Sequence, residues 1–150
     1  MIYDSNFGNN EKLAKALSKG LRQAGLSVDV LKIGEFNHSK IQNYELICLG
    51  GPTHMAGISE NMRAFLDDIK SANLRDKKGF CFGTRMDSRM NVFDINGSAK
   101  KIESKLKKKG VKMVKEAVNV IVEGREGPLV EGSEGNFKEF GYELGGILQQ

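Results

Sequence analysis

The chain has 150 residues, 39% of them hydrophobic, and carries a formal net charge of +4. This length suits a single domain over residues 1–150, and the low proline content suits a compact globular fold. No run approaches the ~20 apolar residues of a membrane span, and the residues after Met1 lack the basic-then-apolar pattern of a signal peptide. We therefore expect a cytoplasmic protein that does not associate with membranes.

Positive charge is concentrated in one part of the chain. Residues 74–113 contain 12 Lys or Arg against 4 Asp or Glu, a net charge of +8, so the remainder sums to −4. The run of Lys105, Lys107, Lys108 and Lys109 suits the solvated end of a helix, where cations favour the C-terminal dipole. An anionic cofactor or an acidic partner is the alternative. No aromatic residues interleave with this run and no nucleic-acid motif accompanies it, so we do not expect nucleic-acid binding.

The first half of the chain alternates strand-like and helix-like segments. A short apolar strand is expected over residues 1–4. Apolar residues at helical spacing then predict a helix over 11–24, which Gly25 ends as a C-cap. The pattern continues with a strand over 28–33 and another over 45–50. The last of these is a continuous apolar run, as expected of a strand covered on both faces.

The second half continues the same alternation. Ser59 suits the N-cap of a helix. The apolar stripe of that helix is formed by Met62, Phe65, Leu66 and Ile69. The segments that follow are a strand over 79–82, a basic helix over 98–109, a fifth strand over 111–122 and a last helix over 136–148. Because parallel neighbours need right-handed crossovers, this alternation predicts an α/β fold with a doubly wound five-stranded parallel sheet and helices on both faces.

The two cysteines, Cys48 and Cys81, each lie inside an apolar strand-like run. We expect them to be buried, reduced thiols. A disulfide or a redox pair remains the alternative, although the chain has no CxxC motif and no secretory context.

The turn after the first expected strand has the composition of an anion site. In a doubly wound sheet, ligands bind beyond the carboxyl ends of the strands. This turn precedes a helix, whose free N–H groups and positive dipole end favour a phosphate. Gly8 permits close approach of the backbone to a ligand, and the side chains of Ser5, Asn6, Asn9 and Asn10 add donors. A plain polar N-cap turn is the alternative interpretation.

The segment Asp4 to Glu11, with the sequence DSNFGNNE, resembles the phosphate loop of flavodoxins, whose pattern is roughly [ST]-x-[ST]-G-x-[ST]. Ser5, Gly8 and Asn9 match this pattern. Phe7 and Asn10 depart from it, because hydroxyl residues are usual at both places. A phosphate site built mainly from backbone N–H groups tolerates these changes, but two hydroxyl donors are lost.

A second segment, Gly50 to Gly57, is similar to the G-[ST]-P-T-x-x-G loop of the same family. The resemblance implies that this loop passes beside the isoalloxazine ring, and it implicates Pro52, Thr53, His54, Met55, Ala56 and Gly57. His54 and Met55 take the places where many flavodoxins have a stacking aromatic residue. No Ser or Cys nucleophile is paired with His54, so a hydrolytic triad has no support.

The third segment, Gly83 to Asp94, follows the fourth expected strand, where flavodoxins place their second ring-binding loop. Its implied cofactor-binding residues are Gly83, Thr84, Arg85, Arg89 and Asn91. Short-chain flavodoxins usually have an acidic loop here. This loop has Arg85 and Arg89 instead. Its start, FGTR over residues 82–85, together with the segments 97–102, 126–132 and 139–141, resembles a flavodoxin branch common in archaea and bacteria.

The resemblance covers nearly the whole chain and implies a sheet order of 2-1-3-4-5 and FMN as the cofactor, with no catalytic residue or metal of its own. A one-electron carrier between redox proteins is the function that it favours. An NAD(P)H-dependent FMN or quinone reductase and a flavin-free interaction domain remain alternatives. The basic rim of the ring site predicts partners that are acidic on their docking face. We expect a monomer or a weak dimer.

Overall fold

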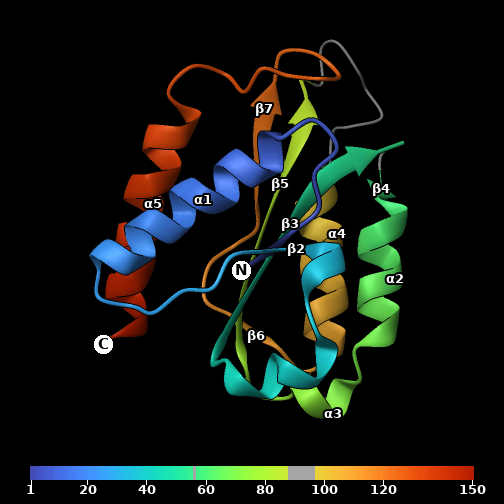
Figure 1. Ribbon diagram of the computed structural model, residues 1–150, viewed down its shortest axis with the longest axis vertical. Coiled ribbons are helices and arrows are strands. Elements are labelled where there is room, and N and C mark those ends of the chain that lie inside the picture. Colours follow the sequence, from blue (N-terminus) through green and yellow to red (C-terminus); the bar gives the residue numbers. More distant parts are fainter. Residues whose placement is uncertain (56, 88–96) are drawn as a thin grey trace.

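A computed structural model describes residues 1–55, 57–87 and 97–150 (Figure 1). Its strands and helices alternate along the chain as the sequence predicts. The strands are β1 (Ile2–Tyr3), β2 (Leu31–Lys32), β3 (Leu46–His54), β4 (Gly57–Ile58), β5 (Lys78–Met86), β6 (Lys112–Met113) and β7 (Val118–Val122). The helices are α1 (Asn9–Gln23), α2 (Glu60–Asp68), α3 (Ser71–Leu74), α4 (Gly97–Lys108) and α5 (Ser133–Leu148), with 3-10 turns η1 (Ile33–Glu35) and η2 (His38–Asn43).

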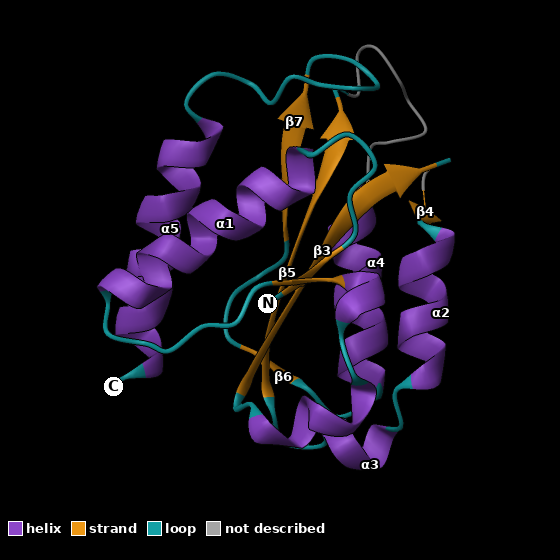
Figure 2. Cartoon of the chain, viewed as in Figure 1, coloured by secondary structure: helices purple, strands orange, loops and turns teal. Residues whose placement is uncertain are grey.

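The parallel strands follow the order β2-β1-β3-β5, and both β6 and β7 pair with β5. Counting β6 and β7 together as the fifth strand, this confirms the expected order 2-1-3-4-5. The two-residue strand β4 is an addition, and it pairs antiparallel with the end of β3. Helices α1 and α5 cover one face of the sheet, while α2 and α4 cover the other (Figure 2). None of the described helices is long and apolar enough to cross a membrane.

The predicted strands differ in detail from the observed ones. Those expected over 45–50 and 79–82 are longer, since β3 continues to His54 and β5 to Met86. The expected strand over 28–33 is reduced to Leu31–Lys32, because Ile33 already begins the 3-10 turn η1. The expected fifth strand is interrupted. Gly79 pairs with Met113 and Phe82 with Val118, so the four residues 114–117 lie opposite the two residues 80–81, and two extra residues bulge out. The sequence pattern did not reveal this bulge.

The buried carboxylate of Glu103 on α4 fills the break between β6 and β7. Its Oε2 accepts a 2.7 Å hydrogen bond from the backbone N–H of Ala117, and its Oε1 lies 3.2 Å from Lys107 Nζ. The break leaves a backbone donor that the sheet ladder does not use, and a side chain of α4 accepts from it. This bond fixes α4 relative to the strands that carry the carboxyl-end loops.

Cys48 and Cys81 are buried in different halves of the core. Cys48 packs among the side chains under α1 and α5, whereas Cys81 packs under α2 and α4. Their side chains point to opposite faces of the sheet and both thiols are free, so the alternative of a disulfide or redox pair is wrong. Burial raises the pKa of the Cys48 thiol to about 11 and also raises the pKa of Cys81.

Helices α1 and α5 cross at very close range. A Cβ at Gly20 of α1 would collide with the backbone of Lys138 and Tyr142, and a Cβ at Gly141 of α5 would collide with the carbonyl of Leu17. Glycine at these positions is therefore required by the packing of two backbones. The crossing holds α1 in place, and the first turn of α1 forms part of the site described next.

Candidate functional site

A cavity of about 460 Å³ lies at the carboxyl ends of the parallel strands. The loops that follow β1, β3 and β7 meet the end of β5 there, at the upper end of the molecule in Figure 1. Sites for small molecules typically measure roughly 300–1,000 Å³. The cavity is lined by Ser5, Asn6, Phe7, Asn9, Asn10, Pro52, Thr53, His54, Met55, Thr84, Arg85, Met86, Val122 and Arg125.

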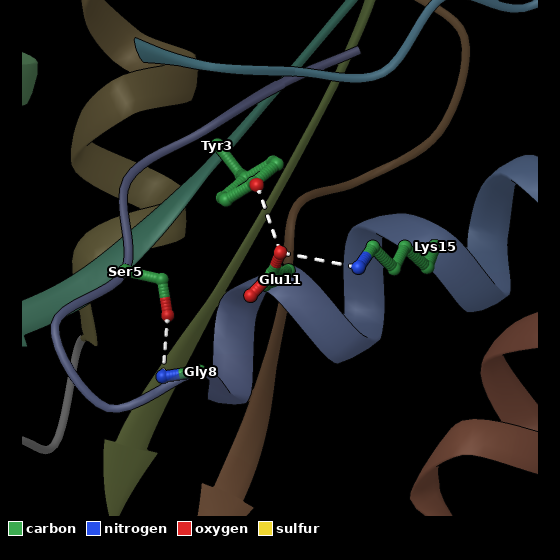
Figure 3. A network of polar contacts seen from close by, with 5 residues as sticks. All are labelled: Tyr3, Ser5, Gly8, Glu11 and Lys15. Atoms are coloured by element: carbon green, nitrogen blue, oxygen red, sulfur yellow. Dashed lines mark hydrogen bonds and ion pairs between the residues drawn. The ribbon is translucent and has the colours of Figure 1, made fainter. Parts of the chain in front are cut away.

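The turn between β1 and α1 forms the first wall of the cavity. Gly8, the N-cap of α1, has a φ of 89°, a left-handed conformation that glycine adopts without steric cost. Its N–H donates a 3.0 Å hydrogen bond to Ser5 Oγ, which closes the turn (Figure 3). Because α1 begins at Asn9, the free N–H groups and positive dipole end of its first turn lie at the cavity wall. An anion is the ligand that this turn favours.

A polar network holds the first turn of α1 against β1. The Tyr3 hydroxyl donates a 3.1 Å hydrogen bond to Glu11 Oε1, and Lys15 Nζ lies 3.1 Å from the same oxygen (Figure 3). The hydrogen bond from Lys15, followed by that from Tyr3, lowers the pKa of Glu11. Burial, followed by the hydrogen bond to Glu11, raises the pKa of Tyr3. The helix start is thus anchored away from the cavity and stays open to a ligand on the cavity side.

Asn10 reaches across the cavity floor to β5. Its side chain is buried, and its Nδ2 donates a 3.0 Å hydrogen bond to Thr84 Oγ1. Its Oδ1 is buried without a hydrogen-bond partner among the described residues. Such a group costs about 1–3 kcal/mol. A ligand that donates to this oxygen would remove the cost. An anion would also remove the cost if the Asn10 amide rotated by a half-turn. Nδ2 could then donate to the anion, and Thr84 Oγ1 could donate to Oδ1.

Asn9 connects the same helix start to the loop after β7. Its Nδ2 donates a 3.2 Å hydrogen bond to the carbonyl oxygen of Glu126. Gly127 has a φ of 108°, and a Cβ at this residue would lie 2.8 Å from Asn9 Oδ1. The close approach of this loop to α1 places Arg125 at the cavity.

The loop after β3 forms the second wall. Pro52 and Thr53 line the cavity from the end of β3, and His54 Nε2 lies 3.4 Å from Asn6 Nδ2 of the first wall. Met55 follows with a φ of 48°, uncommon for a residue other than glycine, and its side chain is 99% exposed. The chain then turns back, so that Gly57 pairs with His54. The tip of this loop therefore stands out at the mouth of the cavity.

Hydrogen bonds through Thr53 tie the walls together. Thr53 Oγ1 donates to the carbonyl oxygen of Thr84 at 2.8 Å and accepts from the N–H of Ser98, the second residue of α4, at 2.8 Å. The Ser98 hydroxyl in turn donates to the carbonyl oxygen of Gly51 at 2.7 Å. The ends of β3 and β5 and the start of α4 thus form one rigid unit beneath the cavity.

Behind the first wall, the buried carboxylate of Asp4 fixes the start of α2. Its Oδ2 accepts a hydrogen bond from Ser59 Oγ, which itself accepts from the N–H of Met62. Ser59 is therefore the N-cap of α2, as predicted. Asp4 does not line the cavity, but it positions the loop after β3 relative to the loop after β1.

Two arginines bring positive charge to the cavity. Arg85 is half-buried at the end of β5, where its Nη1 donates a 3.3 Å hydrogen bond to the carbonyl oxygen of Met86. Arg125 lines the cavity from the loop after β7. The sequence interpretation missed Arg125, Met86 and Val122. A signal was available for Met86 and Val122, because they end β5 and β7 at the same edge of the sheet as β1 and β3. None was available for Arg125, whose place depends on the packing of the loop after β7.

The structure brings most of the predicted site residues together. Those that line the cavity are Ser5, Asn6, Phe7, Asn9, Asn10, Pro52, Thr53, His54, Met55, Thr84 and Arg85. Gly8, Gly57 and Gly83 are not part of the lining. Gly83 is buried under α4, where a Cβ would meet the Ser98 hydroxyl and the carbonyl of Gly51. Ala56, Arg89 and Asn91 lie outside the described residues.

Comparison with known protein families gives a match to flavodoxin over residues 1–140. The chain belongs to the flavodoxin family. Flavodoxins bind FMN and transfer electrons, so FMN is the cofactor that the family assigns to this chain. The resemblance drawn from the three loops is confirmed.

Comparisons with individual proteins support the assignment to the flavodoxin family. A flavodoxin of Clostridium saccharobutylicum is 31% identical over 85 residues, which are 56% of this chain and 53% of that protein. An NAD(P)H dehydrogenase (quinone) of Cupriavidus metallidurans is 33% identical over 87 residues, 45% of this chain and 44% of that protein. The matched segments thus span about half the length of these relatives. The fold is similar to that of a flavodoxin from the domain Archaea, with a TM-score of 0.82 at 18% identity over 99% of this chain and 96% of that one.

The cavity of this flavodoxin-family chain fits FMN chemically. The phosphate is a dianion near neutral pH, and the start of α1 offers it backbone N–H groups and the positive dipole end. The ribityl hydroxyls can donate to a buried acceptor, and Asn10 Oδ1 is one without a partner among the described residues. No group of three or more His, Cys, Asp or Glu that could hold a metal occurs in the described part of the chain.

Proposed function

We propose that this chain is an electron carrier, which holds FMN in the cavity and passes electrons between redox proteins. The observation that carries this proposal is the mouth of the cavity. Phe7 and Met55 line it with side chains that are 48% and 99% exposed. Exposed apolar side chains beside a cofactor site offer a contact surface to a protein partner.

FMN supplies the redox chemistry when it is bound, and the chain supplies position and electrostatics. The phosphate would be held at the start of α1 by Gly8 and its polar neighbours. The ring end would lie between the loop after β3 and the end of β5. The residues proposed for this part are Pro52, Thr53, His54, Met55, Ala56, Gly57, Gly83, Thr84, Arg85, Arg89 and Asn91.

The charge of the rim favours acidic partners. Arg85 and Arg125 both line the cavity, and no Asp or Glu lines it among the described residues. An acidic docking face would be attracted to this rim, and association would slow as added salt screens the charges. We propose that such partners meet the chain in the cytoplasm, and that the chain itself is a monomer or a weak dimer.

An NAD(P)H-dependent FMN or quinone reductase is the second candidate. The match to the quinone dehydrogenase of Cupriavidus metallidurans over 87 residues favours it. A third interpretation, a flavin-free interaction domain, rests on Phe7 and Asn10, where the usual hydroxyl residues of the phosphate loop are replaced.

Anaerobic mixing experiments distinguish the three functions. The FMN-loaded protein is mixed first with NADPH or NADH alone, and then with a flavodoxin reductase and NADPH. A carrier is bleached rapidly only when the reductase is present. Rapid bleaching by the nicotinamide alone would establish the reductase, and a colourless protein that takes up no FMN would establish the flavin-free domain.

A further inference from the structure

The loop after β7 is a β-hairpin that carries Arg125 at its tip. Backbone hydrogen bonds of 2.9 and 3.1 Å join residues 121–123 to residues 128–130. At the tip, the N–H of Gly127 donates a 3.0 Å hydrogen bond to the carbonyl oxygen of Gly124, which closes a β-turn. Arg125 is the second residue of this turn, so the hairpin fixes the position of its backbone.

The hairpin rests on the start of α1, at the upper end of the molecule (Figure 1). Asn9, the first residue of α1, donates a 3.2 Å hydrogen bond from Nδ2 to the carbonyl oxygen of Glu126, which directly follows Arg125. Asn9 itself directly follows Gly8, the N-cap of the helix. Arg125 therefore lines the cavity beside the phosphate turn, residues 5–10.

The asparagine side chains of the phosphate turn are directed at protein partners. Asn9 is bonded to the hairpin, and Asn10 Nδ2 donates to Thr84 Oγ1 at 3.0 Å. Asn6 Nδ2 lies 3.4 Å from His54 Nε2. At two further places the turn lacks the hydroxyl residues that are usual in the family. All these side chains are neutral, so none of them balances the charge of a phosphate dianion.

Arg125 is a cation that the cavity offers on the side of this turn. It is exposed, and within the described part of the chain no residue forms a hydrogen bond or an ion pair with its guanidinium. Arg85, in contrast, donates to the carbonyl oxygen of Met86 at the end of β5. Glu123 and Glu126 belong to the same hairpin as Arg125, but neither lines the cavity. A guanidinium can form two parallel hydrogen bonds with phosphate oxygens and adds a full positive charge.

We propose that Arg125 binds the phosphate of FMN and so makes the cavity select FMN over riboflavin. This inference rests on the proposed binding of FMN in the cavity. In this role, the guanidinium supplies charge-assisted hydrogen bonds in place of the hydroxyl donors that Phe7 and Asn10 do not provide. The start of α1 supplies backbone N–H groups to the same phosphate. Arg85 is left as the cation at the ring end, so the two arginines of the lining have separate roles.

Titrations of the full chain with FMN and with riboflavin test this role. Arg125→Gln should bind FMN about tenfold more weakly than the wild type, because charge-assisted hydrogen bonds to the phosphate are lost. Its affinity for riboflavin should be unchanged, because riboflavin has no phosphate. Arg125→Lys keeps the charge but not the planar fork, and its affinity for FMN should lie between the two. Arg63→Gln is the matched control, since it removes an exposed arginine outside the lining, and it should leave both affinities unchanged.

The dependence of FMN binding on salt gives a second measurement. The affinity of the wild type for FMN should fall as the ionic strength rises, and the fall should be smaller for Arg125→Gln. Where the wild type binds FMN, equal affinities of the wild type and Arg125→Gln for FMN would overturn the role of Arg125 alone. So would an equal loss of affinity for both flavins, because the substitution would then have disturbed the hairpin. A wild type that takes up no FMN would overturn the proposed function as well.

Discussion

Asn10 and Thr84 are 74 residues apart in the sequence, yet Asn10 Nδ2 donates a 3.0 Å hydrogen bond to Thr84 Oγ1. This bond joins the start of α1 to the end of β5 beneath the cavity. Both side chains are buried, so water does not compete for it. The same asparagine keeps an oxygen without a partner among the described residues, and it therefore connects the stability of the fold to the binding of a ligand.

Replacing Asn10 should weaken FMN binding more than it weakens the fold. Asn10→Ala removes one buried hydrogen bond and the acceptor facing the cavity, so we expect FMN to bind about tenfold more weakly. Fluorescence titration measures this change. Asn136→Ala on the exposed face of α5 is the control and should leave the affinity unchanged. An affinity for FMN equal in the two variants would show that Asn10 has no role in binding.

Gly8→Ala tests the backbone conformation of the phosphate turn. The φ of 89° is unfavourable for alanine, and open space surrounds the position of the added Cβ. The free energy of unfolding should therefore fall by about 1–2 kcal/mol from conformational strain alone. Gly135→Ala is a matched control, because its Cβ also meets open space but inside helix α5. It should raise stability by about 0.5–1 kcal/mol, since alanine favours a helix. Denaturant titration of both variants measures these free energies of unfolding. A Gly8→Ala variant as stable as the wild type contradicts the prediction.

Arg85 should raise the reduction potential of bound FMN. The reduced flavin is anionic, and a cation some 6–8 Å away would stabilise it by about 0.5–2.5 kcal/mol, or roughly 20–110 mV for one electron. Arg85→Gln should lower the potential of that step by this amount in a spectroelectrochemical titration. Arg63→Gln removes an exposed charge on α2 outside the cavity lining and should change it little. Equal potentials for Arg85→Gln and the wild type would mean that Arg85 does not interact with the ring.

The buried thiol of Cys48 should make the fold sensitive to alkaline pH. Burial raises its pKa from 9.0 to about 11, so its contribution to stability is fully present below pH 9 and is lost as the pH rises through about 11. Over this interval of pH, the free energy of unfolding of the wild type should fall by about 1–3 kcal/mol relative to that of Cys48→Val. Unfolding by urea at pH 8 to 11 measures the difference. A difference that stays constant with pH would show that the thiol titrates normally in the folded state.

Periodicity and loop composition were sufficient to predict most of the fold. The apolar runs at β3 and β5, the helical spacing in α1 and the Ser59 cap all depend on local chemistry, and the structure confirms them. The bulge between β6 and β7 was missed because it depends on Glu103, a residue of another element that accepts from the N–H of Ala117.

The residues of the candidate site likewise divide into those that the local sequence reveals and those that depend on tertiary packing. Ser5, Asn10, Thr53 and Thr84 could be selected from their positions directly after strands or inside family-like loops. Arg125 could not, because its place at the cavity depends on the packing of the loop after β7 against Asn9.

Titration of the purified chain with FMN and with riboflavin shows whether the cavity holds the cofactor by its phosphate. If the start of α1 holds the phosphate, FMN fluorescence is quenched at a ratio of one to one, and riboflavin binds at least about tenfold more weakly. Absence of FMN binding, or equal affinity for the two flavins, would contradict the account.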